Sequence, residues 1–183
     1  MKKLLLPLLA LALLAGCGSP VEKNAKTSIK ALKEKDMDTL ASLVHPVKGV
    51  TFTPYTYVDK GRNIFFYAKD IEDAMGDSTL HRWGDHDGSG SPIYLTFADY
   101  YDQFVYDHDY AKAKEVTWNR KMEHGSSIDN ASDAYPNSQI VEYYFPGFEE
   151  QYGGMDWVSL RLVWEEFDGG WYLVGIIHDQ WGP

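Results

Sequence analysis

Four polar residues in the C-terminal half could carry out acid/base chemistry or orient an anion. Glu142 and Arg161 lie in the middle of two segments rich in β-branched and aromatic residues, and His178 and Asp179 are adjacent in a third. Such segments are typical of strands, in which successive side chains point to opposite faces, so only one of His178 and Asp179 can enter a given pocket. Glu142, Arg161 and either His178 or Asp179 could therefore line an acid/base or anion-orienting pocket. Alternatively, Glu142 and Arg161 form a structural ion pair across the sheet, and His178 is a hydrogen-bonded wall residue.

A metal site is a second candidate, in the loop Asp85-His86-Asp87-Gly88-Ser89-Gly90. The spacing of Asp85, Asp87 and Ser89 resembles the first half of an EF-hand loop, in which such side chains converge on calcium. The second half departs from that pattern, because Pro92 is an extra residue and Thr96 stands where a bidentate glutamate is expected. Two interpretations stay open: a calcium site, or a glycine-rich turn with capping carboxylates.

The N-terminal segment predicts a secretory leader. Lys2 and Lys3 precede an apolar run from Leu4 to Leu14, and this run is too short to span a bilayer, since a membrane helix needs about 20 apolar residues. It ends at Leu14-Ala15-Gly16-Cys17, which resembles the lipobox of bacterial lipoprotein signal peptides. The resemblance implies cleavage before Cys17 and lipidation of that cysteine.

This leader sets the expected organisation of the chain. We expect a signal peptide at 1–16, a lipidated anchor and short linker at 17–22, and a single domain at 23–183. The resemblance places that domain outside the cytoplasm, on either the plasma membrane or an outer membrane. Cys17 is the only cysteine in the chain, so the domain itself has no thiol for a disulfide or a thiolate metal site.

The charge pattern excludes nucleic acid as an expected partner. The chain carries a net charge of −10, whereas phosphate binding needs clustered cations. Four lysines do share one stripe of the first predicted helix: Lys23, Lys26, Lys30 and Lys33. Because this stripe lies close to Cys17 in the sequence, it could face anionic headgroups, or it could be a solvated helix face.

Helices are predicted first and strands later. Helices are expected at 21–35, at 37–44 after an Asp36 N-cap, at 70–75, and from a capping box at Thr96 and Asp99 onward. Strands are expected at 49–59, 63–68, 115–122, 139–145, 157–167 and 171–181. Residues 76–92 and 123–138 are predicted to be loops, and Asp168-Gly169-Gly170 predicts a tight turn between the last two strands.

Aromatic residues are abundant, and four tryptophans lie near predicted element ends, where a ring can stay half exposed. These are Trp83, Trp157, Trp171 and Trp181. Half-exposed rings suit sugars, peptides or protein partners, and packing in the core is the alternative.

This order of elements resembles the NTF2-like (cystatin-like) superfamily. The resemblance is carried by the segments 31–46 (ALKEKDMDTLASLVHP), 49–59 (GVTFTPYTYVD) and 160–181 (LRLVWEEFDGGWYLVGIIHDQW). It implies an α+β fold in which N-terminal helices pack on a curved antiparallel sheet to form a cone. It also implies dimerisation through the outer sheet face, where Trp157, Val163 and Trp171 would fit. The superfamily hosts isomerases, dehydratases, binding proteins and structural modules, so the fold alone fixes no activity.

The function we expect is that of a lipid-anchored, extracytoplasmic binding or interaction module of the cell envelope, without catalysis. Its ligand would be a small molecule or an envelope component held in the cone and lined by Trp83, Glu142, Arg161 and His178. The first alternative is an isomerase or hydrolase that uses His178, Asp179 and Glu142. The second is a calcium-stabilised surface domain; no other cofactor is expected.

Overall fold

The computed structural model describes residues 18–120, 124–125 and 128–181. The expected signal peptide and Cys17 lie outside these residues. Within the described ranges, no helix combines the length and the apolar character needed to cross a membrane.

Two helices open the described chain where the sequence predicts them. Helix α1 (Pro20–Glu34) begins at a capping box in which the side chains of Ser19 and Glu22 each accept a hydrogen bond from the other residue's backbone N–H. Helix α2 (Met37–Leu43) begins at Asp36, whose carboxylate accepts a hydrogen bond of 3.0 Å from the Thr39 backbone N–H. The predicted Asp36 cap is therefore confirmed.

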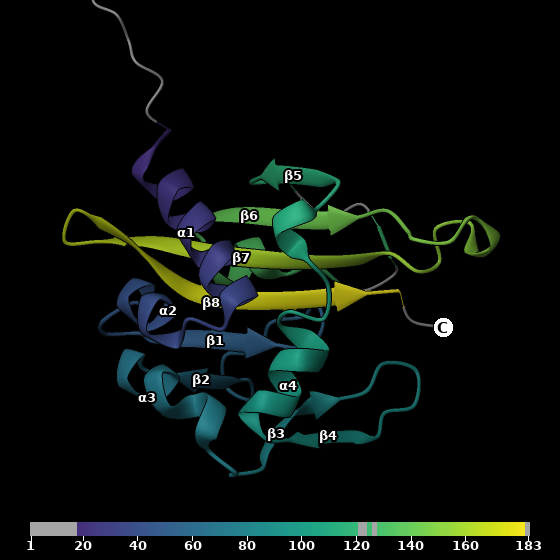
Figure 1. Cartoon of the computed structure of the whole chain (residues 1–183), viewed down its shortest axis with the longest axis horizontal. Coiled ribbons are helices and arrows are strands. Elements are labelled where there is room, and N and C mark those ends of the chain that lie inside the picture. The colour runs from purple at the N-terminus through teal and green to yellow at the C-terminus, as the bar shows by residue number, and fades with distance from the viewer. Residues whose placement is uncertain (1–17, 121–123, 126–127, 182–183) are drawn as a thin grey trace, which may run out of the picture.

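Six strands form the main sheet, in the order β2-β1-β8-β7-β6-β5 (Figure 1). Their bounds are β1 Val50–Thr53, β2 Ile64–Phe66, β5 Glu115–Trp118, β6 Ser138–Phe145, β7 Val158–Phe167 and β8 Gly170–Gln180. Neighbouring strands are antiparallel except β1 and β8, which run parallel. The sheet is therefore antiparallel, as expected, apart from this one pair, in which β1 lies beside the last strand of the chain.

Helices cover one face of this sheet, which we call the inner face. Helices α1, α2 and α4 (Phe97–Phe104) lie in front of the strands in Figure 1. The inner face carries Leu160, Leu162 and Ile176, which pack in one apolar core with the buried residues of the helices. Short helical segments complete the chain: α3 Ala68–Asp73, η1 Ala74–Gly76, η2 Tyr110–Lys112, α5 Ala131–Ala134 and η3 Glu150–Tyr152. The expected α+β class, with helices packed on a curved sheet, is confirmed.

A two-stranded hairpin lies where the sequence predicts only a loop. Strands β3 (His81–Asp85) and β4 (Pro92–Leu95) pair antiparallel and bury Trp83 and Ile93 against the core. The flanking glycines and aspartates are typical of a turn, and they do form one at 86–91. The prediction of a loop over 76–92 is wrong at 81–85, because few apolar residues in this stretch mark a strand and its Trp83 is buried only through tertiary contacts.

The opposite face of the sheet, which we call the outer face, is also covered. A small apolar cluster joins Val163 and Ile177 of the sheet to Ala131 and Tyr135 of the segment 128–135. Within a single copy, Trp157 and Val163 are buried and Trp171 is partly buried. Residues 128–135, which we call the covering segment, lie over Val163. Dimerisation through this face stays a prediction.

Candidate functional site

The residues expected to line one pocket lie in three places. Glu142 of β6 and Arg161 of β7 are directly opposite each other on the outer face. His178 of β8 pairs with Leu160 and lies on the inner face. Trp83 lies in the β3–β4 hairpin. A single site lined by these four residues is therefore not formed, although a role for each one separately stays a prediction.

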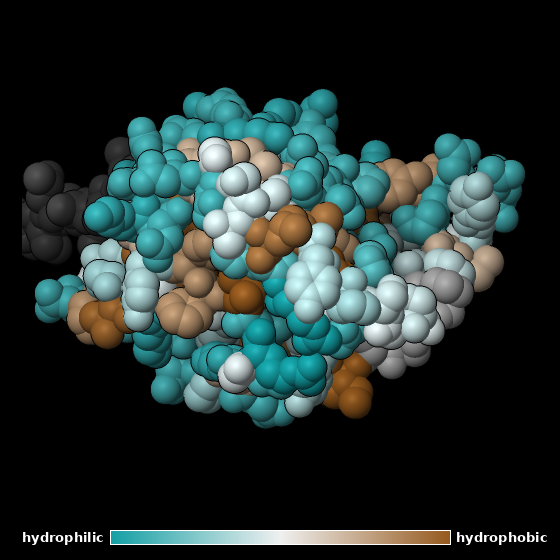
Figure 2. All heavy atoms as spheres, turned by 90° about the horizontal axis from the view of Figure 1, so that it is seen from below, coloured by the Kyte–Doolittle hydropathy of each residue, from teal (hydrophilic) through white to brown (hydrophobic). Residues whose placement is uncertain are grey.

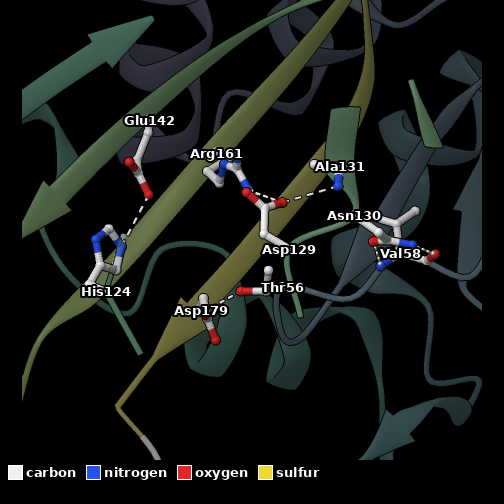
Figure 3. A network of polar contacts seen from close by, with 9 residues as sticks. All are labelled: Thr56, Val58, His124, Asp129, Asn130, Ala131, Glu142, Arg161 and Asp179. Carbon is white, nitrogen blue, oxygen red and sulfur yellow. Dashed lines mark hydrogen bonds and ion pairs between the residues drawn. The ribbon is translucent and has the colours of Figure 1, made fainter. Parts of the chain in front are cut away.

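The outer face carries a buried group of charged residues, shown in Figure 3. We call it the outer polar cluster, and its members are His124, Asp129, Glu142, Arg161 and Asp179. The expected pairing of Glu142 with Arg161 is replaced by two separate contacts: Arg161 Nη1 lies 2.9 Å from Asp129 Oδ1, and Glu142 Oε1 lies 3.3 Å from His124 Nε2. Arg161 is thus paired with Asp129 of the covering segment, and Glu142 with His124, which precedes that segment in the chain.

The Arg161–Asp129 pair is part of a larger attachment of the covering segment. Asp129 Oδ1 also accepts a hydrogen bond of 3.1 Å from the Ala131 backbone N–H. The next residue, Asn130, bonds both backbone groups of Val58: its Oδ1 accepts from the N–H at 2.8 Å, and its Nδ2 donates to the carbonyl at 2.9 Å (Figure 3). These directional contacts fix residues 129–131 over the sheet.

Asp179 is the second carboxylate buried on the outer face. It lies on β8, opposite Ser159 of β7, and its Oδ2 accepts a hydrogen bond from the Thr56 hydroxyl. Burial raises the pKa of Asp179, and the Thr56 hydrogen bond opposes that rise. A carboxyl group with a raised pKa is a candidate acid/base group, as the sequence suggested.

The outer polar cluster retains hydrogen-bonding capacity. Arg161 Nε, Ser159 Oγ and Asp179 Oδ1 are buried and make no hydrogen bond to another described residue. Such groups could orient an anion or hold a proton. Arg161 and Asp179 are each only 1% exposed, so a ligand would reach them only after the covering segment moved.

His178 belongs to a different pair, on the inner face. Its Nδ1 lies 3.0 Å from the Pro54 carbonyl oxygen, and its Nε2 lies 3.5 Å from Asp107 Oδ2. Burial alone would raise the pKa of Asp107, but contacts with His108 and His178 hold it well below its usual range. The Asp107 partner is separated from His178 by seventy residues of chain, and no local pattern in the sequence marks it.

The loop resembling an EF-hand forms the turn of the β3–β4 hairpin. Asp85 pairs with Arg82 at 2.5 Å, and Asp87 Oδ1 accepts a hydrogen bond from the Gly88 backbone N–H. Ser89 bonds Ser91. The described part of the chain contains no group of three or more histidine, cysteine or acidic residues able to hold a metal ion. These contacts are those of a glycine-rich turn, and a calcium site at Asp85, Asp87 and Ser89 stays a prediction.

Two of the four tryptophans near predicted element ends, Trp83 and Trp157, are buried. Trp83 stacks on Tyr100 with ring centroids 3.7 Å apart, and its Nε1 donates to the Leu95 carbonyl at 3.0 Å. Trp157 packs edge-on against His124. For these two rings the interpretation as packing is confirmed, because tertiary contacts cover rings that stand near strand ends. Trp181 is 38% exposed, and Trp171 is partly buried against the core.

An open pocket lies beside the covering segment, and the sequence gives no signal for it. We call it the lysine–aromatic pocket; it has a volume of about 270 Å³ and is lined by Lys48, Thr51, Lys60, Phe65, Tyr67, Tyr135 and Val174. These residues come from five separate parts of the chain, so only the fold brings them together. Other pockets include a larger one of about 320 Å³, which shares Phe65 and is otherwise lined mainly by residues of α3 and its neighbours. A smaller one of about 160 Å³ lies beside Trp83, Tyr57 and Arg62.

Comparisons with known proteins bear on the fold alone. No family model matches the sequence, and no curated protein matches it either. Several solved structures do resemble the chain. Several of the structures it resembles carry the NTF2-like name, as the order of elements predicts.

One is an NTF2-like protein of unknown function from Shewanella oneidensis MR-1, at 8% identity and a TM-score of 0.36, covering 87% of this chain and 96% of the other. Another, provisionally named a dehydratase of the NTF2-like family, comes from Streptomyces avermitilis. It is 11% identical, with a TM-score of 0.38, and covers 88% of this chain and 94% of the other. At this similarity no ligand or activity is transferred.

Proposed function

We propose that the protein is a ligand-binding module tethered to the cell envelope through a lipid on Cys17, and that it does not catalyse a reaction. The binding function is supported by a difference in how accessible two groups of residues are to a ligand. The acid/base candidates His178, Arg161 and Asp179 are buried and paired with protein groups, whereas the lysine–aromatic pocket is open and lined by cationic and aromatic side chains. Such a lining suits recognition of a ligand.

The tether is supported by the leader and by the helix that follows it. The residues of the lipobox lead directly into α1, on which Lys23, Lys26, Lys30 and Lys33 are all exposed. Lys33 pairs with Asp109, and Lys30 lies 3.9 Å from Glu34. A lysine near an anionic membrane surface contributes about 1 kcal/mol, so Lys23 and Lys26 would add to a lipid anchor.

The tether is tested by expressing the full-length chain in a bacterium that processes lipoproteins. We expect the protein in the membrane fraction, with mass spectrometry of its N-terminal peptide showing an acylated Cys17. The matched control is Cys17→Ser, which should leave the leader uncleaved and unacylated. Recovery of the wild-type protein from the cytosol with an unmodified Cys17 would overturn the tether.

An enzyme is the second candidate, favoured by the buried pair of His178 and Asp107. A histidine beside a carboxylate with a depressed pKa is an arrangement that acid/base catalysts use. The difficulty is access, because His178 has no exposed surface. A reaction that is lost in a correctly folded His178→Asn variant would replace the binding proposal with this one.

A further inference from the structure

The lysine–aromatic pocket combines a cation and exposed rings on an otherwise acidic protein. It lies on the outer face, where β1 and β8 meet the loops at 45–49 and 54–63 and the end of α5. Elsewhere the surface is largely hydrophilic, with apolar side chains in small separate groups, as Figure 2 shows for the side of the molecule that carries β2, β3 and α3. A local positive site therefore stands out against a net charge of −10.

Lys60 supplies the cation. Its Nζ lies 3.8 Å from the centroid of the Tyr135 ring, and it forms no ion pair with another described residue. Burial lowers the pKa of Lys60, while Glu165 acts in the opposite direction and Lys48 adds slightly to the lowering. Lys60 is exposed, and its ammonium group lies over the Tyr135 ring without a paired anion among the described residues, so a ligand carboxylate would supply that anion.

Lys48 also lines the pocket but, unlike Lys60, is part of an ion pair. Its ammonium group pairs with Glu165, so most of its charge is already balanced. The turn that presents it is fixed by His45, whose Nδ1 accepts hydrogen bonds of 3.1 Å from the backbone N–H groups of Val47 and Lys48. With Lys48 paired to Glu165, Lys60 remains the main anchor for an anion.

Two rings provide the apolar part of the pocket. Phe65 is 50% exposed and Tyr67 is 48% exposed, and their centroids lie 5.4 Å apart in an edge-to-face arrangement. Covering these rings with another flat apolar group would remove their surface from water and add favourable ring contacts. An inorganic anion would leave both rings exposed, and a neutral ring would leave Lys60 without a partner.

The pocket wall is held in place before any ligand binds. The turn that carries Lys60 is closed by hydrogen bonds between Asp59 and Asn63, including one of 2.6 Å from the Asp59 N–H to Asn63 Oδ1. Just before it, Val58 is clamped by Asn130 through both backbone groups. A pre-ordered site loses less conformational entropy on binding, which favours affinity from a small contact area.

We propose that the lysine–aromatic pocket binds small aromatic carboxylates, with the carboxylate on Lys60 Nζ and the ring against Phe65 and Tyr67. This inference rests on the proposed binding function and names the ligand class of its pocket. The volume of about 270 Å³ lies near the lower end of the range for small-molecule sites, which fits a ligand with one ring. The acidic body does not prevent such binding, because charges more than about 8 Å apart are largely screened at physiological salt.

Isothermal titration of the domain with phenylacetate tests this assignment, with phenylacetamide and acetate as matched ligands. We expect saturable binding of phenylacetate. Phenylacetamide lacks the charge and acetate lacks the ring, so each should bind about tenfold more weakly or worse. Higher salt should weaken phenylacetate binding, because the Lys60 contact is partly exposed.

Variants then locate the site. Lys60→Met keeps the length of the side chain and removes its charge, and Phe65→Ala removes a ring that is half exposed, so both should fold as the wild type does. Each should lose about tenfold in phenylacetate affinity, whereas Lys114→Met, which changes an exposed lysine beside the far edge strand β5, should change nothing. Circular dichroism and the melting temperature confirm that each variant is folded.

Three results would overturn the inference: no saturable binding at millimolar phenylacetate, equal affinity for phenylacetamide, or unchanged affinity in a folded Lys60→Met variant. None of these would touch the proposed tether, which depends on acylation of Cys17. Conversely, an unmodified Cys17 would leave the binding result standing.

Discussion

The two faces of the sheet are covered in different ways. On the inner face, helices and the β3–β4 hairpin bury a layer of rings in which Trp83 stacks on Tyr100 and Phe52 packs edge-on against Phe97. On the outer face, the covering segment has only a small apolar cluster and is attached by the Arg161–Asp129 pair and the Asn130–Val58 clamp. One cover is held mainly by packing and the other by a few directional contacts.

This difference has an energetic consequence. Apolar packing sums over many weak contacts, so a single truncation removes one share of a large total. A buried ion pair concentrates its contribution in two groups, and removing one leaves the other charged and uncompensated. The lysine–aromatic pocket lies next to the covering segment, on the outer face. There a substitution removes less apolar packing than it would on the inner face.

Removing the central ring of the inner face should produce the largest effect. Trp83→Ala deletes the Tyr100 stack and the hydrogen bond to the Leu95 carbonyl, so we expect the free energy of unfolding to fall by about 3–5 kcal/mol. Urea denaturation measures this change. The control is Tyr94→Ala on the neighbouring strand β4, where an exposed ring should cost less than about 0.5 kcal/mol. A similar loss in both variants would show that the hairpin does not depend on the inner core.

Breaking the charged attachment of the outer face should cost slightly less. Arg161→Met removes the guanidinium group that pairs with the buried Asp129 carboxylate, and we expect a loss of about 3 kcal/mol. The double variant Arg161→Met, Asp129→Leu should recover a substantial part of that loss, because no uncompensated charge remains. If the loss in the double variant equals the sum of the losses in Arg161→Met and in Asp129→Leu alone, the covering segment is held by something other than this ion pair.

The two buried carboxylates should give the smallest effects, of opposite sign. The native pKa of Asp107 lies below the unfolded value of about 3.9, so its contribution is present above pH ~4 and lost as the pH falls. Asp107→Asn should therefore destabilise the protein at pH 7, by about 1–2 kcal/mol, and reduce the loss of stability in acid. The native pKa of Asp179 is raised, so its ionisation weakens the fold as the pH rises.

Asp179→Asn should accordingly leave stability at pH 7 unchanged or higher, since the amide oxygen still accepts from Thr56. Its stability should also rise less than that of the wild type between pH 7 and 4. Urea denaturation across this pH range compares both variants with the wild type. If Asp107→Asn and Asp179→Asn both destabilise the protein at pH 7, the expected opposite contributions of the two carboxylates are wrong.

Much of the fold could be predicted from the sequence because its signals are local. Asp36 and Thr96 cap helices through hydrogen bonds to residues three positions away, so neighbours in the chain decide those starts. The turn between β7 and β8 needs Asp168 and Gly169 at positive φ, which these residue types tolerate. The alternating apolar residues of β7 likewise follow from the period of a strand, which no distant contact alters.

The candidate site could not be predicted in the same way, because it depends on contacts between residues that lie far apart in the sequence. Arg161 was recognisable as a buried-strand arginine, but its partner is Asp129 of the covering segment and not Glu142 across the sheet. The hairpin of β3 and β4, the parallel pairing of β1 with β8, and the meeting of Lys60 with Phe65 and Tyr135 likewise join parts of the chain that only folding brings together. The physical reason is one of range: caps and turns are decided within a few residues, whereas charge partners and pocket walls are decided by the packing of the whole domain.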